Sequence, residues 1–427
     1  MSDNNRERKT SQANQELRTI TLPELMVDVR ADLLEVGIKA GLAVMAEMFA
    51  EDVDAICGSR YRHEKLRKAS RWGTTGGEVV LGGRKVRVKR PRVRSDTHEV
   101  ALPTYEHFKD SDPLTKRVLE QVLLGVSARH YERSLESNGS CLRVRGVSKS
   151  AVSRRFLMAT AERIAEWMNK SLDGLDIVAL FMDGIRVGDH MVVAAIGIDA
   201  DGRKHALGIW EGATENSAVC QALVDNLLSR GLRVDKLMLF VIDGAKALTK
   251  VIRQTFGKNA AIQRCQRHKM ENVKSHLPKG LQMLVSLEMR RAYQSDDVNK
   301  ARGILKGLIC RLEDAHPGAT ASLREGLEET LTVIALRLPK ALRRSLQTTN
   351  IVESGMSIVR DVSRHVKRWR SGKMVLRWAA TGFMEAEKRF RRINGYQEIP
   401  RLVAALTRSD DACRSKRKRD LDKSKAA

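Results

Sequence analysis

The spacing of apolar residues divides the first part of the chain into helical and β segments. Residues 23–57 carry apolar side chains at helical spacing, which predicts one long helix. Two β-rich runs then stand on either side of Gly82-Gly83, a two-residue turn that favours a hairpin. Residues 114–169 return to helical spacing, whereas residues 1–20 show neither pattern and are expected to form a disordered arm.

The middle of the chain has the most regular pattern. Short apolar runs predict five strands, at residues 177–182, 191–198, 205–210, 237–242 and 260–264. A helix is expected after the third strand and another after the fourth. The order β, β, β, α, β, α, β resembles an RNase H-like mixed sheet, in which three meandering strands precede parallel ones.

The later part of the chain is helical, and this sets the expected domain organisation. The fold class is α/β: an RNase H-like mixed-sheet core with a helical insertion, preceded by a mostly helical region. The expected divisions are an arm (1–20), a helical region with a basic hairpin (21–110), a helix-turn-helix-like region (111–170), the first part of the core (171–269), the insertion (270–346), the end of the core (347–400) and a basic tail (401–427).

The charge of the chain is large and unevenly distributed. The 427 residues include 77 Lys and Arg against 52 Asp and Glu, a formal net charge of +25. Residues 60–94 hold 13 basic and 2 acidic residues, and residues 340–394 hold 14 and 4, whereas residues 176–256 hold 9 and 10. A near-neutral apolar block between two cationic ones indicates a core flanked by surfaces for a polyanion, with nucleic acid as the default partner.

Composition also excludes several classes of protein. Apolar residues make up 42% of the chain, which supports a real core. No apolar run approaches the roughly 20 residues of a membrane-spanning helix, and the polar N-terminus does not resemble a secretory signal. Six widely spaced cysteines suit a reducing, intracellular compartment rather than a disulfide scaffold.

Three groups of residues are candidates for DNA binding. In the hairpin, the basic residues alternate with valines, so one strand face is either a phosphate-tracking ribbon or an ordinary solvated surface. Residues 146–156 resemble the turn and second helix of a helix-turn-helix, although any capped amphipathic helix has a similar pattern. The second cationic block supplies the third group. The candidates are Lys85, Arg87 and Lys89; Ser150, Ser153, Arg154 and Arg155; and Arg364, Lys367, Arg368 and Arg370.

Two aspartates are candidates for metal binding. Asp183 and Asp243 each follow an apolar strand run and precede Gly, which places them at the edge of the predicted sheet. Turn chemistry explains either one alone, but the two together in this strand order favour a shared site. Carboxylate oxygens are ligands that Mg²⁺ prefers, and a third carboxylate would help to hold a second ion for phosphoryl transfer.

Glu353 is the candidate third carboxylate. It lies three residues after Asn350, an apt N-cap, so a capping box is the alternative interpretation of this glutamate. A carboxylate near a helix start can instead point off the helix end toward the sheet edge.

Cys265 and His268 form a Cys-x-x-His motif that supplies half of a structural zinc site. His276 and Cys310 are possible further ligands, but no second pair stands out. A local packing contact is the favoured interpretation of the motif, and zinc binding is the alternative.

Eight motifs occur in a characteristic order: Asp183-Gly184, Gly197 with Asp201-Gly202, Leu207-Gly208, Glu215-Asn-Ser217, Arg230-Gly-Leu232, Ile242-Asp-Gly244, Gln263-Arg-Cys-Gln-Arg-His268 and Thr349-Asn-Ile-Val-Glu353. Their joint order and spacing over about residues 20–395 resemble the bacterial Mutator-type insertion-sequence transposases. The resemblance implies a DDE transposase with an RNase H-like core, and it assigns the DDE carboxylates to Asp183, Asp243 and Glu353.

The expected activity combines this resemblance with the candidate site. The protein would bind transposon-end DNA, hydrolyse a phosphodiester with two Mg²⁺ ions (Mn²⁺ being able to substitute), and join the freed 3′-OH to target DNA. A homo-oligomer on paired ends is expected, in the bacterial cytoplasm at the nucleoid. The alternatives are a non-catalytic helix-turn-helix DNA-binding regulator and an RNase H-like nuclease that cuts without joining.

Overall fold

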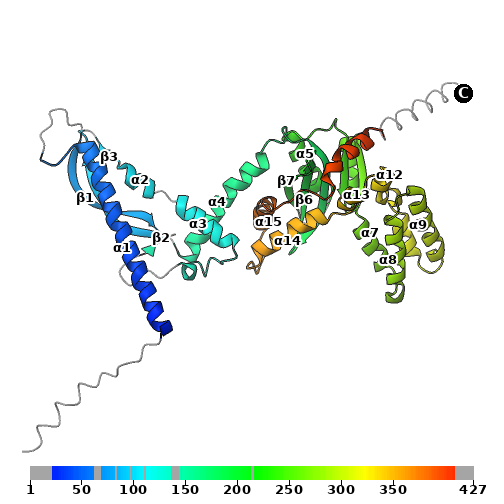
Figure 1. The fold of residues 1–427 in the computed structure, drawn as a ribbon, viewed down its shortest axis with the longest axis horizontal. Helices are drawn as coiled ribbons and strands as arrows, with labels where there is room; N and C mark the ends of the chain where they lie inside the picture. Colours follow the sequence, from blue (N-terminus) through cyan, green and yellow to red (C-terminus); the bar gives the residue numbers. More distant parts are fainter. Residues whose placement is uncertain are drawn as a thin grey trace, which may run out of the picture. The chain divides into compact units, whose positions relative to one another are not determined.

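A computed structural model describes most of the chain (Figure 1), namely residues 22–61, 69–81, 84–96, 98–109, 112–135, 144–145, 147–212 and 216–408. The predicted arm at 1–20, the turn Gly82-Gly83, Glu215 and the chain after residue 408 lie outside the described residues. The structure forms two compact units. The N-terminal unit holds the described residues up to 156 except 123–125, and the C-terminal unit holds those three residues and everything from 157 onward.

The N-terminal unit packs a long helix against a hairpin. Met45, Phe49 and Val53 recur every four residues on α1, and this face is buried with Val79 and Val93 of the hairpin strands. Strands β1 and β2 pair antiparallel up to Leu81 opposite Arg84, which confirms the predicted hairpin. Its elements are α1 (Leu22–Cys57), β1 (Ser70–Leu81), β2 (Arg84–Arg94), β3 (Glu99–Val100), α2 (Pro103–Lys109), all but the last residue of α3 (Asp112–Leu123), η1 (Glu132–Ser134), β4 (Val144–Arg145) and the start of α4 (Lys149–Asn169).

The C-terminal unit is mixed α/β and is built on a five-stranded sheet. Its strands are β5 (Ile177–Val187), β6 (His190–Asp199), β7 (Lys204–Gly212), β8 (Met238–Ile242) and β9 (Ala260–Arg264). Its helices are α5 (Ser217–Ser229), α6 (Lys246–Phe256), η2 (Gly257–Asn259), α7 (Gln266–Ser275), α8 (Lys279–Tyr293), α9 (Val298–Leu312), α10 (Pro317–Arg324), α11 (Leu327–Thr330), α12 (Thr332–Ala335), α13 (Lys340–Leu346), α14 (Asn350–Ser363), α15 (Gly372–Glu387) and η3 (Tyr396–Glu398).

The strand order across this sheet is β7-β6-β5-β8-β9. Strands β5, β6 and β7 form an antiparallel meander, and β5, β8 and β9 run parallel. The predicted sequence of strands and helices is therefore confirmed. The exception is the end of β5, which the apolar run places at Met182; the strand instead continues to Val187 in an antiparallel pairing with β6.

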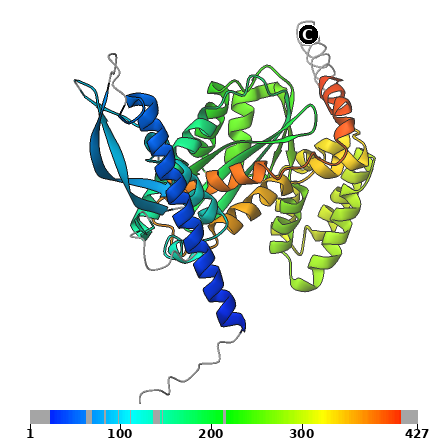
Figure 2. The same ribbon diagram turned by 60° about the vertical axis from the view of Figure 1, so that its left-hand side comes forward.

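Helices cover both faces of the sheet, so its central strands are buried on both sides. One face packs against α14 and α15, with Val352, Met356 and Phe383 in the shared core. Leu223 of α5 and Val251 of α6 pack against the other face. Figure 1 labels α14 and α15 beside the green strands, and Figure 2 shows the same orange part of the chain against the sheet from another side. This sandwich explains why the strand runs are continuously apolar rather than alternating.

The helices between β9 and α14 form their own small core. The fully buried side chain of Gln263, on the edge strand β9, hydrogen-bonds to these helices. Its amide donates to the Thr330 carbonyl over 3.0 Å and accepts from the Val333 N–H over 2.9 Å. Because α11 and α12 lie here, the sheet edge is covered rather than open.

Two further features differ from the sequence expectation or add to it. The sequence pattern ends the core at residue 400, but residues 399–408 are helical and bury Leu402 and Leu406 against the sheet-side core. In the part of the chain that the structure describes, no helix combines the length and apolar character needed to cross a membrane.

Candidate active site

The register of the sheet sets the first two candidate residues. The parallel pairing of β5 with β8 ends at Met182 opposite Ile242, and Asp183 and Asp243 are the next residues along these strands. Asp243 follows its strand as predicted. Asp183 does not, because it lies inside β5 and pairs with Ala194 of β6. In the sequence, the polar residue and glycine at 183–184 indicate the end of a strand. No local feature indicates that β5 continues to Val187.

Glu353 reaches the site from α14. Thr349, one residue before the predicted cap, is the N-cap of this helix, and its side chain makes no capping hydrogen bond. The capping-box alternative for Glu353 is therefore wrong, since its carboxylate instead faces α7. There, Arg267 donates to Oε2 over 2.6 Å, and Nε2 of His268 lies 3.5 Å from Oε1.

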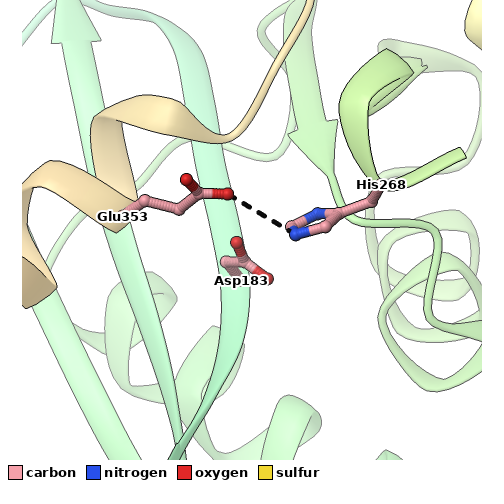
Figure 3. A group of neighbouring side chains, drawn as sticks. All are labelled: Asp183, His268 and Glu353. Carbon is pink, nitrogen blue, oxygen red and sulfur yellow. Dashed lines mark ion pairs between the residues drawn. The ribbon is translucent and has the colours of Figure 1, made fainter. Parts of the chain in front are cut away.

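Three side chains converge at this edge of the sheet (Figure 3). One ligand atom from each of Asp183, His268 and Glu353 lies within 4.8 Å of those of the other two. Asp183 is only 3% exposed, whereas His268 and Glu353 are half-buried. The site thus draws on β5, α7 and α14, which are far apart in the sequence.

Asp243 lies beside this group rather than within it. Its Oδ1 accepts a hydrogen bond from the Ala245 N–H over 2.8 Å, as expected for an aspartate that follows a strand. Its charge is nevertheless close enough to Asp183 to affect that residue's protonation. The structure therefore brings Asp183 and Glu353 together and leaves Asp243 as their neighbour.

The electrostatics of the site follow from burial and from this crowding of charge. Burial, then the charge of Asp243, raises the pKa of the Asp183 carboxyl to about 7. A hydrogen bond with Cys265 raises the pKa of His268 to about 9, and the nearby aspartates contribute to the rise. Burial alone would raise the pKa of the Cys265 thiol, but hydrogen bonds with His268 and Thr349 outweigh it and leave that pKa lowered.

The donor set at the sheet edge suits a hard divalent cation. Two carboxylates that face each other in a largely buried position repel unless a proton or a cation lies between them. Oxygen donors are what Mg²⁺ prefers, whereas the imidazole of His268 is a poor magnesium ligand. His268 therefore fits better as an ion-pair partner of Glu353 than as a metal ligand.

Zinc binding by Cys265 and His268 gains no support from their surroundings. Over the described residues, the group of Asp183, His268 and Glu353 is the one set of three potential metal-ligating side chains that lie together. Neither His276 nor Cys310 joins Cys265 and His268 in such a set, and Cys310 is exposed. Both residues of the motif instead contact Thr349, which lies 84 residues after Cys265 in the sequence.

Two residues at the site carried no sequence prediction. Thr349 is completely buried, and its N–H donates to Sγ of Cys265 over 3.4 Å. Arg267 contacts both Glu353 and Asn350. Thr349 belongs to the sequence motif that ends at Glu353, and Arg267 belongs to the motif that ends at His268. Membership of these two motifs was the signal that the sequence offered for both residues.

The predicted DNA-binding residues of the N-terminal unit are mostly exposed. Arg87 and Lys89 are exposed and Lys85 is half-buried, while Val86 between them is buried, as the alternation predicted. Around the start of α4, Ser150, Ser153 and Arg154 are also exposed. Arg155 differs: it is half-buried, and burial lowers its pKa, so its side chain is less available than the sequence suggested.

The four cationic candidates between α14 and α15 lie in a loop that is fixed to the sheet. Arg364 donates to the Leu124 carbonyl over 3.0 Å. The other three, Lys367, Arg368 and Arg370, are neighbours of Trp369 in the sequence. Trp369 lies against Gly188 at the β5–β6 turn, where an added Cβ would come within 2.8 Å of its ring. An aromatic side chain therefore holds the loop that carries these cations.

A mixed sheet with carboxylates gathered at one edge defines a candidate metal-dependent enzyme, and comparison with known proteins gives the family. Residues 10–392 match the family described as transposase, Mutator family. The chain therefore belongs to the Mutator family of transposases. It is 26% identical over 363 residues to the transposase for insertion sequence element ISRM5 of Rhizobium meliloti, covering 83% of this chain and 88% of that one.

Two further relatives show similarity of comparable extent. The transposase for insertion sequence element IS1081 of Mycobacterium tuberculosis is 25% identical over 382 residues, which is 86% of this chain and 89% of that protein. The transposase for insertion sequence element IS6120 of Mycolicibacterium smegmatis is 27% identical over 293 residues, or 66% and 86% of the two chains. The sequence resemblance to Mutator-type transposases is confirmed.

Proposed function

We propose that this chain is a DDE transposase with an RNase H-like core, in which Asp183, Asp243 and Glu353 are the catalytic carboxylates. The observation that carries the proposal is the approach of Asp183 and Glu353 within one 4.8 Å group although 170 residues separate them in the sequence. The antiparallel meander followed by parallel strands supports the RNase H-like assignment.

The three carboxylates would hold two Mg²⁺ ions, with Mn²⁺ able to substitute. When bound, such ions activate an attacking hydroxyl and stabilise the charge that develops on the phosphate and the leaving oxygen. Burial and the charge of the neighbouring Asp243 destabilise the ionised form of the Asp183 carboxyl. A bound cation would therefore stabilise this carboxylate.

The substrates would be transposon-end DNA and target DNA. In the first step a water oxygen bonds to phosphorus and the bond to the 3′ oxygen breaks, which frees a 3′-OH. In the second step that 3′-OH attacks a target phosphodiester and displaces its 3′ oxygen. Lys85, Arg87 and Lys89 of the hairpin, Ser150, Ser153, Arg154 and Arg155 of α4, and the cations of the loop before α15 would bind the DNA.

A homo-oligomer that pairs two DNA ends is part of the proposal, and so is a location in the bacterial cytoplasm at the nucleoid. Both follow from the proposed reaction, because one site must act on strands from both ends and on chromosomal DNA.

The test uses the full chain with duplexes taken from the DNA that flanks its gene, in the presence of Mg²⁺ or Mn²⁺. Asp183→Asn, Asp243→Asn and Glu353→Gln are each expected to lower strand cleavage at least about 100-fold while DNA binding persists. Asp189→Asn, the same change at an exposed turn residue, is the matched control and should cleave like the unmodified chain.

The outcomes separate the candidate functions. Cleavage and joining that depend on all three carboxylates support the transposase. Cleavage that survives in Asp183→Asn overturns the site assignment. Cutting without joining identifies a nuclease, and salt-sensitive binding without any metal-dependent product identifies a DNA-binding regulator.

A further inference from the structure

The Cys-x-x-His motif occupies a junction that the proposed chemistry does not explain. The N–H of Cys265 donates to the Ile242 carbonyl over 2.7 Å, directly before Asp243. On its other side, Sγ of Cys265 accepts from the N–H of Thr349 over 3.4 Å and lies 3.6 Å from the Thr349 hydroxyl. This one cysteine therefore contacts both the end of β8 and the N-cap of α14.

His268 completes the connection to Glu353. Its Nδ1 lies 3.4 Å from the Thr349 hydroxyl, and its Nε2 lies 3.5 Å from Oε1 of Glu353. One residue along from Cys265, the N–H of Gln266 donates to the Gln347 carbonyl over 3.0 Å. The segment of residues 265–268 thus holds the segment of residues 347–353 through backbone and side-chain contacts.

Thr349 is suited to the centre of this arrangement. An N-cap threonine ordinarily uses its hydroxyl on its own helix, but the Thr349 side chain makes no capping bond and is fully buried. Its hydroxyl instead lies 3.6 Å from Sγ of Cys265 and 3.4 Å from Nδ1 of His268, and it lies close enough to Asp183 to oppose the rise in the pKa of that carboxyl. A buried hydroxyl with these neighbours fixes the start of α14 relative to the start of α7.

We propose that Thr349, held by Cys265 and His268, is a positioning residue that sets the start of α14 so that the Glu353 carboxylate stays beside Asp183. The Cys-x-x-His motif is then the support of this threonine and not half of a zinc site. The inference rests on the proposed function, since it assigns these residues to the geometry of the same cation-binding carboxylates.

The test compares Thr349→Val, which keeps the shape and removes the hydroxyl, with Thr349→Ser, which restores it. Thr381→Val is the matched control, because Thr381 is a buried helical threonine whose hydroxyl donates within its own helix, to the Arg377 carbonyl. Two properties of the full chain are measured: Mn²⁺ affinity, and hydrogen–deuterium exchange of the amides of residues 349–355 without metal.

Thr349→Val is expected to weaken Mn²⁺ binding by about 10-fold to 100-fold, the usual cost of removing a group that orients a metal ligand. Its amides at the start of α14 should exchange faster than those of the unmodified chain. Thr349→Ser should return both values toward normal, and Thr381→Val should change neither. A general loss of stability would raise exchange elsewhere in the unit and would not be rescued by serine, and that result overturns the positioning role.

Unchanged Mn²⁺ affinity and unchanged exchange in Thr349→Val also overturn the inference. Should this variant fail to fold, Cys265→Ala is used with the same expected and overturning results, and Cys265→Ser as its conservative partner. Asp183→Asn separates the two proposals: cleavage that survives in Asp183→Asn overturns the proposed function, whereas an inactive Asp183→Asn with a normal Thr349→Val overturns only the positioning role.

Discussion

Met182 lies directly opposite Ile242 in the parallel pairing of β5 with β8, and an aspartate follows each of them. Strand register therefore makes Asp183 and Asp243 neighbours without any contribution from the rest of the chain. Glu353 is different, because 110 residues separate it from Asp243, and its place depends on how α14 packs. The β5–β8 register and the packing of α14 can therefore be tested by separate substitutions.

The protonation of Asp183 makes stability depend on pH. Its folded pKa of about 7 lies above the ordinary value of 3.8, so the folded chain holds an extra proton between these pH values. The stabilisation is complete below about pH 4 and is lost as pH rises toward 7. In metal-free protein, the free energy of unfolding should fall over this range relative to Asp183→Asn, by up to about 4 kcal/mol.

Urea denaturation at a series of pH values measures this difference. Asp189→Asn should follow the profile of the unmodified chain, because Asp189 is exposed. Parallel profiles for the unmodified chain and Asp183→Asn would show that Asp183 is not held in a costly environment.

The contact between α14 and α15 depends on Gly382. A Cβ added there would lie 2.7 Å from the Cα of Val359, a backbone atom that cannot move aside cheaply. Gly382→Ala should destabilise the fold by about 1–3 kcal/mol through overpacking. Gly303→Ala is the control, since this helical glycine has open space around it, and alanine there should stabilise by about 0.5–1 kcal/mol. Equal melting temperatures for Gly382→Ala and Gly303→Ala would contradict this close contact between α14 and α15.

A buried lysine fastens the helical insertion. Lys269 is 1% exposed, and its Nζ donates to the carbonyls of Ser322 and Glu325 over 2.5 and 2.6 Å at the end of α10. Lys269→Met leaves these carbonyls without their donor and should cost about 2 kcal/mol. Lys274→Met removes an ion pair with Glu271 nearer the surface and should cost less than about 1 kcal/mol in denaturant unfolding. The reverse order would refute this anchoring role.

The loop cations before α15 should add to DNA affinity in a salt-dependent way. Replacing Lys367, Arg368 and Arg370 together by Gln should weaken binding, and the slope of log affinity against log salt should fall by roughly 0.9 for each phosphate that the loop no longer neutralises. Lys279, Lys300 and Lys306 of the insertion, all exposed, provide a control with the same change of charge. Equal slopes for the two triple variants would remove the loop from the DNA-binding surface.

Much of the sheet was predictable because its strands are buried on both faces. Their apolar runs, bounded by Gly and Asp, indicated the order of elements, and the positions of Asp183 and Asp243 after two such runs indicated a shared edge. The pairing of the hairpin strands around Gly82-Gly83 was equally visible, since alternation of valine with basic residues fixes the strand faces.

Long-range contacts were not predictable in the same way. The extension of β5 past Asp183 pairs with β6, and Thr349, the N-cap in place of Asn350, contacts Cys265, which is 84 residues away. Local pattern carries no information on either partner. Leu402 and Leu406 are a further example. The sequence around them is basic and was assigned to the tail, but both side chains pack into the core.

Carboxylates from separate parts of the chain are proposed to share a divalent cation, and anomalous diffraction from crystals grown with Mn²⁺ and end DNA would locate that ion. We expect an anomalous peak at coordination distance, roughly 2.0–2.3 Å, from carboxylate oxygens of both Asp183 and Glu353. Manganese bound only at Cys265 and His268, or no peak beside Asp183 at saturating Mn²⁺ on bound DNA, would contradict it.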